Sequence, residues 1–165
     1  MKKKIILFVC KGNSGRSQMA EAFFNFFSKS RRAISAGTNP DKKIHPWTIQ
    51  IMKEVGIDVS WQKPKSLSNK LMKGADKIIV MDSELLDNIP KKYLSKTEEW
   101  KIEKLFGKSI RQVRKIRNQI KIKTKQLIKK PSLREGLISK KTHLEDFAVK
   151  GHQSPQRVQP SGHFS

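Results

Sequence analysis

The chain opens on two apolar segments with different periods. Residues 4–9 form a nearly continuous apolar run, which is typical of a central parallel strand covered on both faces. Residues 18–27 follow with phenylalanine at several positions and predict a buried, wide-faced helix. Short, largely apolar runs at 33–36 and 77–81 predict two more strands, and the segment Glu98 to Ile102 resembles a last short strand. We therefore expect a central parallel sheet of about four strands.

Helical patterns separate the predicted strands. Residues 47–55 and 67–74 predict two short helices, and residues 109–130 predict a long helix with a single apolar stripe. Ser109 and Gln112 match a capping box at the start of this long helix. Strands that alternate with helices indicate an α/β fold, a single domain with helices on both faces of the sheet.

The pattern ends at Pro131. Glycine and proline interrupt the remaining residues and no hydrophobic period survives there. We therefore predict a folded domain over 1–130 and a flexible basic tail over 131–165. Three of the four histidines lie in this tail, at a spacing that fits no metal site, so we expect no metal.

The charge of the chain is strongly positive and uneven. The 165 residues carry a formal net charge of +22, and residues 101–130 contain 12 Lys and Arg but one acid, Glu103. A solvated helix face explains such a run. The alternative is a surface that attracts nucleic acid, anionic lipid or acidic substrates. No aromatic side chains are interleaved with the charges of the predicted helix, which favours the solvated face and leaves nucleic acid as an open partner.

Cysteine usage and apolar runs bear on the compartment. No run of about 18 apolar residues is present, so we expect no membrane span. The apolar segment after Lys4 resembles the start of a signal peptide but is too short for one. Cys10 is the only cysteine and cannot form an internal disulfide, which favours a cytoplasmic, reducing compartment.

That single cysteine opens the segment Cys-Lys-Gly-Asn-Ser-Gly-Arg-Ser, residues 10–17, where the first predicted strand gives way to the first predicted helix. A helix start offers unpaired N–H groups and positive dipole charge, so it attracts anions. Gly12 and Gly15 let the backbone curl toward one point. Arg16 can offer a planar fork to a tetrahedral oxyanion. The same field favours the thiolate of Cys10, which is the nucleophilic form.

This Cys-x5-Arg-Ser spacing resembles the phosphate-binding loop of the low-molecular-weight protein tyrosine phosphatases and of the arsenate reductases that share their fold. The resemblance covers roughly residues 1–130. Besides 9–17, the matching segments are Met19-Ala20-Glu21-Ala22, Ser35-Ala36-Gly37-Thr38, His45-Pro46, Glu54 to Asp58 and Ala75 to Asp82. Their order along the chain makes the match more specific than the loop alone.

The resemblance implies hydrolysis of phosphomonoesters through a phosphocysteine at Cys10, without a metal or other cofactor. It implies that Arg16 and the loop N–H groups bind the phosphate, that Asn13 braces the loop, and that Ser17 donates a hydrogen bond to the thiolate. The phosphate-binding residues are then Lys11, Gly12, Asn13, Ser14, Gly15 and Arg16. The expected partners are a phosphorylated protein or a small aryl phosphate, with inorganic phosphate or arsenate as ligands.

One expected group is missing from the sequence. The family takes its general acid from an Asp-Pro pair ahead of the last helix, and Lys104-Leu105 stands at the corresponding place. Glu103, one residue earlier, is the candidate substitute, and a solvated charge explains it equally well. A lysine is a poor proton donor at neutral pH, so we expect weak activity or a preference for good leaving groups.

Two further functions stay open. An arsenate reductase would need an external thiol, because Gly15 stands where many relatives carry a second cysteine and no other cysteine is present. A module that binds oxyanions or phosphoproteins without turnover would explain the missing acid.

We predict that a variant truncated after Lys130 folds and keeps the turnover of the full chain, because the hydrophobic period ends at Pro131. Thermal unfolding and a p-nitrophenyl phosphate assay of both proteins would measure this. A clear loss of melting temperature or rate on truncation would show that residues 131–165 support the domain.

Overall fold

The computed structural model describes residues 2–130 of the chain. The strands are β1 (Lys4–Cys10), β2 (Arg31–Gly37), β3 (Lys77–Val80) and β4 (Thr97–Glu99). The α-helices are α1 (Arg16–Phe27), α2 (Pro46–Lys53), α3 (Asn69–Gly74) and α4 (Ile110–Lys129). Two 3₁₀ helices, η1 (Ser83–Asn88) and η2 (Lys91–Lys96), lie between β3 and β4.

The four strands form one sheet in the order β2-β1-β3-β4, and every neighbouring pair is parallel. This confirms the predicted parallel sheet. The central strand β1 pairs with β2 along its whole length, so that Cys10 lies opposite Gly37 at the end of the ladder. On its other side β1 pairs with β3 from Ile6 to Val9.

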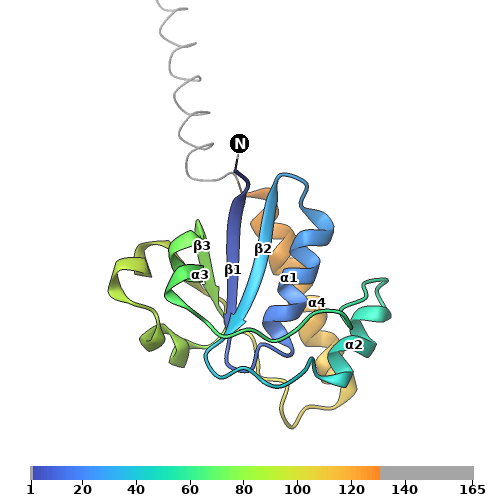
Figure 1. Cartoon of the computed structure of the whole chain (residues 1–165). Coiled ribbons are helices and arrows are strands. Elements are labelled where there is room, and N and C mark those ends of the chain that lie inside the picture. The colour runs from blue at the N-terminus through green and yellow to red at the C-terminus, as the bar shows by residue number, and fades with distance from the viewer. Residues whose placement is uncertain (1, 131–165) are drawn as a thin grey trace, which may run out of the picture. The chain divides into compact units, whose positions relative to one another are not determined.

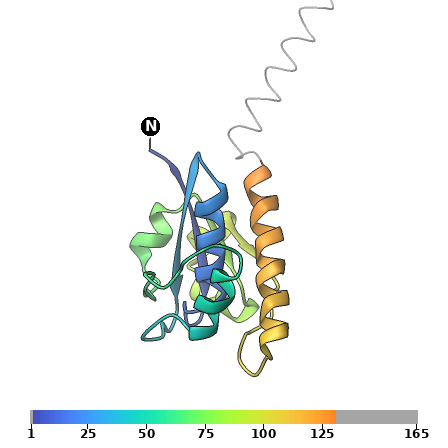
Figure 2. The same cartoon turned by 90° about the vertical axis from the view of Figure 1, so that its right-hand side faces the viewer.

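Side chains of β1 alternate between two hydrophobic clusters, one on each face of the sheet. Ile6, Phe8 and Cys10 pack in the cluster that contains residues of α1 and α4. Leu7 and Val9 pack in the cluster that contains residues of α3, η1 and η2. Figures 1 and 2 show α1 and α4 side by side on one face of the sheet and α3 on the other. The predicted helices on both faces are therefore confirmed.

Aromatic side chains fill the space between the sheet and α1. Phe8 contacts Phe24 in an edge-to-face arrangement with ring centroids 6.1 Å apart, and Trp100 with centroids 5.5 Å apart. Phe23 and Phe24 are fully buried, whereas Phe26 is exposed on the outer face of α1. The phenylalanine-rich segment is therefore mostly core, as expected for a helix that covers a sheet.

The last strand differs from its prediction. It spans Thr97–Glu99, whereas the sequence predicts residues 98–102. The N–H of Trp100 still bonds to the carbonyl of Val80 at 2.8 Å, but the chain then turns so that Trp100 and Ile102 enter the core. Their apolar character comes from this packing, and the strand-like pattern therefore extends past the end of the ladder.

The long helix begins as predicted. The N–H of Ser109 donates to Oε1 of Gln112 at 2.8 Å, and the N–H of Gln112 donates to Oγ of Ser109 at 3.3 Å, which is a reciprocal capping box. Residues Met1–Lys129 form one compact unit. The predicted tail, 131–165, lies outside the described residues. Within residues 2–130 no helix is both long enough and apolar enough to cross a membrane.

A carboxylate on the loop after α2 ties that helix to α4. Arg117 is buried, and its Nη1 donates to the carbonyl of Ile51 at 2.8 Å and to Oε2 of Glu54 at 2.7 Å. Arg114 donates to Glu54 through Nε and Nη2. The hydrogen bond from Arg114 is the main cause that lowers the pKa of Glu54 to about 2.

We predict that Glu54→Gln lowers the stability of the protein at neutral pH, because it leaves the buried charge of Arg117 without its partner. The pKa of Glu54 is lower in the folded protein than in the unfolded chain, so its stabilising contribution is present in full above pH 4.5 and declines as the pH falls toward 2. Urea unfolding midpoints of both proteins from pH 7 to pH 2.5 would measure this. A stability difference that does not shrink on acidification would contradict it.

Candidate active site

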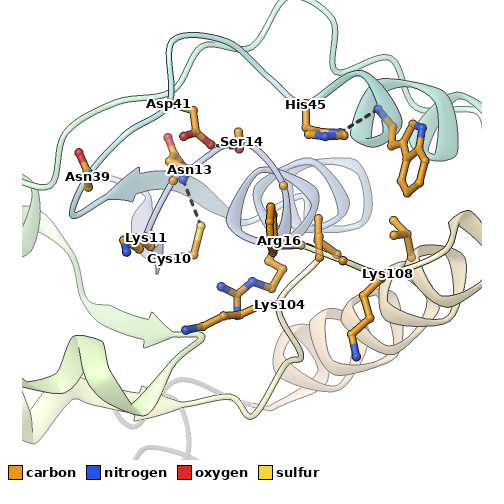
Figure 3. A pocket seen from close by; sticks show the side chains of 17 residues that line it. Cys10, Lys11, Asn13, Ser14, Arg16, Asn39, Asp41, His45, Lys104 and Lys108 are labelled. Carbon is orange, nitrogen blue, oxygen red and sulfur yellow. Dashed lines mark hydrogen bonds between the residues drawn. The ribbon is translucent and has the colours of Figure 1, made fainter.

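Cys10 lies where the connections of the sheet diverge. Cys10 is the last residue of the central strand β1. The helix that follows it, α1, covers one face of the sheet. The connection from β2 to β3 contains α3, which covers the other face. Open parallel sheets form their binding sites at this kind of switch point, beyond the carboxyl ends of the strands. The segment that curls over this point is Cys10–Ser17, and the close-up of the pocket in Figure 3 shows Cys10 near its centre.

The loop presents a set of backbone donors. Within residues 2–130 the N–H groups of Gly12, Ser14 and Gly15 have no protein acceptor. The N–H of Asn13 donates to Sγ of Cys10 at 3.3 Å. Buried or half-buried N–H groups are costly when unpaired, so a loop that keeps several of them open is suited to bind an anion.

Asn13 holds the shape of the loop. Its φ of 49° makes it the only described non-glycine residue in the left-handed region, where asparagine is better tolerated than most residues. Its Oδ1 accepts hydrogen bonds from the N–H of Lys65 at 2.9 Å and from Nε2 of Gln18 at 3.1 Å. Its Nδ2 donates to Oγ of Ser17 at 2.8 Å. The predicted bracing role of Asn13 is consistent with these contacts.

Ser17 connects Asn13 to the nucleophile. Oγ of Ser17 accepts from the amide of Asn13 and lies 2.8 Å from Sγ of Cys10, so its hydroxyl hydrogen can donate to the sulfur. The predicted contact between Ser17 and Cys10 is therefore present in the structure.

A buried polar chain supports this arrangement from behind. Nε2 of Gln62 donates to Oε1 of Gln18 and, at 3.2 Å, to Oε2 of Glu21. Burial is the main cause that raises the pKa of Glu21, and this effect is opposed by the positive charge of Lys65 and a hydrogen bond from Ser35. These side chains fix the amide orientation of Gln18, and through it the carbonyl groups of Asn13.

The carboxylate of Asp82 holds the guanidinium of Arg16 in place, and the sequence analysis did not predict this pair. Nη1 and Nη2 of Arg16 donate to the two carboxylate oxygens of Asp82, at 2.8 and 2.6 Å, and Nη1 also bonds to the carbonyls of Met81 and Ile102. Within residues 2–130 the N–H of Nε and the second N–H of Nη2 have no acceptor. Arg16 therefore keeps one planar fork open, and Asp82 offsets its charge at the start of α1.

Leu105 packs against the opposite side of the loop. A Cβ added to Gly15 would clash with Cδ1 of Leu105, so the leucine occupies the space that a side chain at position 15 would need. A side chain at position 15 would therefore require Leu105 to move. The segment that carries Leu105 also carries Lys104, whose Nζ lies 3.5 Å from Oε1 of Glu84.

The pocket above Cys10 has a volume of about 850 Å³. Its floor is the loop from Cys10 to Arg16, and its two walls come from segments 39–47 and 104–108. Trp47 and Phe106 contribute apolar surface, and Phe106 is 97% exposed. The loop between Thr38 and Pro46 contributes Asn39, Asp41 and His45 to the lining of the pocket.

Glu103 does not line this pocket. Its side chain is 69% exposed, and its Oε2 lies 2.6 Å from Nζ of Lys108. The hydrogen bond from Lys108 is the main cause that lowers its pKa. A general acid must hold a proton at the working pH, so both the position and the ion pair disfavour Glu103 as the donor.

Three further side chains take part in the site. From the sequence, Asp82 is only a reserve candidate for the acid, Asp41 lies on a loop expected to face the substrate, and Gln62 has no assigned role. Asp82 follows a strand that was predicted correctly, so its place at the carboxyl end of β3 was a usable signal. Gln62 lies on a connection without hydrophobic period, and no pattern links it to Gln18. Asp41 lies on the loop after β2, and only the fold shows that its carboxylate accepts a hydrogen bond from Oγ of Ser14.

The fold and this site define an α/β protein with a buried cysteine at the start of a loop whose open N–H groups suit it to bind an anion. The model of the low molecular weight phosphotyrosine protein phosphatase family matches residues 5–137, and the chain belongs to this family. The match runs past the domain boundary predicted at residue 130. The family that the sequence resembles is thereby confirmed.

Known relatives carry two kinds of name. The chain is 34% identical over 131 residues to a protein from Synechocystis sp. named "Glutaredoxin arsenate reductase". The aligned region covers 78% of this chain and 99% of the relative. The chain also resembles the solved structure of the low molecular weight protein tyrosine phosphatase from T. tengcongensis, at 28% identity and a TM-score of 0.72, over 78% of this chain and all of the other. A structure described as "An arsenate reductase in the phosphate binding state" matches at 33% identity and a TM-score of 0.67, over 76% of this chain and 96% of the other.

We predict that Gly37→Ala disrupts the phosphate-binding loop. A Cβ at this position would lie 2.5 Å from the carbonyl oxygen of Lys11 and 2.9 Å from Cβ of Asn13, and a backbone atom cannot move aside without deforming the loop. We expect a loss of about 1–3 kcal/mol of stability and phosphate binding weakened at least about tenfold. Calorimetric titration with inorganic phosphate and urea unfolding would measure both.

Gly74→Ala is the matched control, because nothing lies within 4 Å of a Cβ added there and its φ is not positive. Equal phosphate affinity in the two alanine variants would contradict the proposed contact between β2 and the loop.

Proposed function

We propose that this protein hydrolyses phosphomonoesters through a phosphocysteine formed at Cys10. The observation that carries the proposal is the set of open donors around its sulfur. Gly12, Ser14, Gly15 and Arg16 line the same pocket as the buried thiol of Cys10, and within residues 2–130 their loop N–H groups and one fork of Arg16 have no acceptor. Such donors stabilise the charge that builds on the equatorial oxygens when phosphorus is attacked.

The sulfur must also serve as the leaving group of the second step. Oγ of Ser17 lies 2.8 Å from Sγ and can donate to it, and the N–H of Asn13 donates to the same atom at 3.3 Å. Both donors would stabilise negative charge on the sulfur before attack and after release. Hydrolysis of the phosphocysteine by water then returns the thiolate. No step of this scheme requires a metal or another cofactor.

The walls of the pocket favour aromatic substrates. Trp47 and Phe106 can pack on a ring whose phosphate reaches Cys10, and a fully exposed phenylalanine at a pocket mouth fits a binding role. We therefore propose a phosphotyrosine-containing protein or a small aryl phosphate as the substrate. Lys11, Lys104 and Lys108 line the same pocket and add positive charge that attracts anions. Cys10 has to stay reduced for this chemistry, which supports the cytoplasmic placement proposed from the sequence.

Reduction of arsenate is the second candidate, favoured by the names of similar proteins. In this reaction the thiolate of Cys10 forms a sulfur–arsenic bond while one arsenic–oxygen bond of arsenate breaks and its oxygen leaves as water. An external thiol then attacks the sulfur and forms a mixed disulfide as arsenate, taking two electrons, leaves as arsenite. A second external thiol releases Cys10. Because Cys10 is the only cysteine, the chain cannot supply those electrons itself.

We predict that the wild-type protein hydrolyses p-nitrophenyl phosphate and that Cys10→Ser lowers kcat at least about a thousandfold. Inorganic phosphate should inhibit competitively and protect Cys10 from iodoacetate. Arg16→Lys keeps the charge but loses the fork, and we expect its kcat/KM to fall about 10²–10³-fold.

The same proteins separate the alternatives. Arsenate consumption that depends on added glutathione and on Cys10, without hydrolysis, would establish the reductase. Phosphate protection of Cys10 without either turnover would leave an oxyanion- or phosphoprotein-binding module. Binding of duplex DNA with a steep salt dependence would point to the basic surface of α4 as the functional one.

A further inference from the structure

Asp41 stands out among the acids near Cys10. It is the only carboxyl-bearing residue, among those described, that lines the pocket. Figure 3 shows it on the rim across from Lys104, with Cys10 between them. We propose that Asp41, on the loop after β2, is the general acid that protonates the leaving group, and this inference rests on the phosphatase function proposed above.

The backbone holds Asp41 against the phosphate-binding loop. Its N–H donates to the carbonyl of Gly12 at 2.9 Å, and two residues earlier the N–H of Asn39 donates to the carbonyl of Lys11 at 2.9 Å. One carboxylate oxygen, Oδ2, accepts a hydrogen bond from Oγ of Ser14. A Cβ on Gly12 would lie 2.5 Å from that oxygen, so glycine is what lets the carboxyl approach so closely.

The other acids near the pocket are bound to cations. Asp82 pairs with Arg16, Glu103 with Lys108, and Glu84 with Lys104. Asp41 has no ion-pair partner within residues 2–130, and its hydrogen-bond partner is a neutral hydroxyl. A dianionic phosphate bound beside such a carboxyl disfavours a further negative charge, so it favours the protonated form. That form is the one a general acid needs.

The proton can then be followed through both steps. As the thiolate of Cys10 forms the sulfur–phosphorus bond, the bond from phosphorus to the leaving oxygen breaks. That oxygen takes the proton of Asp41 and departs as an alcohol or phenol. In the second step water attacks phosphorus, Asp41 takes a proton from this water, and the sulfur–phosphorus bond breaks. Phosphate and the thiolate result, and Asp41 is again protonated.

Several other groups face the pocket and bear on its pH dependence. The cations are Lys11, Arg16, Lys104 and Lys108, and the remaining titratable groups are the thiol of Cys10 and the imidazole of His45. Nδ1 of His45 accepts from the N–H of Trp47 at 3.1 Å, so a neutral His45 carries its proton on Nε2. His45 is therefore the competing donor that an experiment must separate from Asp41.

The test compares p-nitrophenyl phosphate with benzyl phosphate in the full chain. Both have an aromatic ring, but only the benzyl alcohol needs a proton in order to leave. We expect Asp41→Asn to lower kcat for benzyl phosphate about 10²–10⁴-fold and kcat for p-nitrophenyl phosphate less than about tenfold. The alkaline limb of the kcat profile for benzyl phosphate should disappear. Asp41→Glu should restore part of the rate, and inhibition by inorganic phosphate should be unchanged or tighter.

Asp87→Asn is the matched control, because Asp87 is an exposed aspartate of η1 that does not line the pocket. If Asp41→Asn binds phosphate normally but keeps the wild-type ratio of the two rates, the inference is wrong and the phosphatase function stands. A leaving-group-selective loss in Glu103→Gln or His45→Gln instead would assign the proton to that residue. Should Asp41→Asn fail to fold, an unchanged ratio in Asp41→Ser would overturn the inference. Absence of any Cys10-dependent hydrolysis in the wild type would overturn the function and the inference with it.

Discussion

Asn13 holds the turn on which the site depends. A left-handed backbone at this position directs the neighbouring N–H groups to one side of the loop, and the side-chain amide bonds to three parts of the protein at once. These bonds reach Ser17 in α1, Gln18 beside it and the backbone of Lys65 on the connection after α2. An unfavourable backbone conformation persists only where such surroundings over-determine it.

The chain as a whole is strongly positive, but acidic residues support the site. The sequence carries a formal net charge of +22, yet the residues that orient the loop from behind include the acids Glu21 and Asp82. Asp82 binds the edge of the Arg16 guanidinium formed by Nη1 and Nη2. The edge formed by Nε and the second N–H of Nη2 is left open by the described residues. A cation held in this way loses little side-chain entropy when an oxyanion binds, because its orientation is already fixed.

The wall that carries Lys104 and Leu105 packs against the loop at Gly15. Leu105 fills the space over Gly15, so a larger side chain in the loop would require a smaller or displaced residue in the wall. The acid of the family pattern is absent from this wall, and Glu103 is turned outward to Lys108. On the facing wall Asp41 rests on Gly12 and Ser14. In the proposed mechanism the acid therefore lies on the wall of segment 39–47 and not on the wall of segment 104–108.

The sequence by itself determined the elements and the nucleophile. Hydrophobic period located β1, α1, β3 and α4 to within a few residues, because these elements bury a face and burial dictates the spacing of apolar residues. The Cys10–Ser17 segment identified the oxyanion loop, because its function depends on local backbone geometry. The tertiary structure alone decided which acids face Cys10 and Arg16. Asp41, Asp82 and Glu103 are equivalent in a pattern of polar residues, and only the packing of two loops and a strand end around one point gives each a different partner.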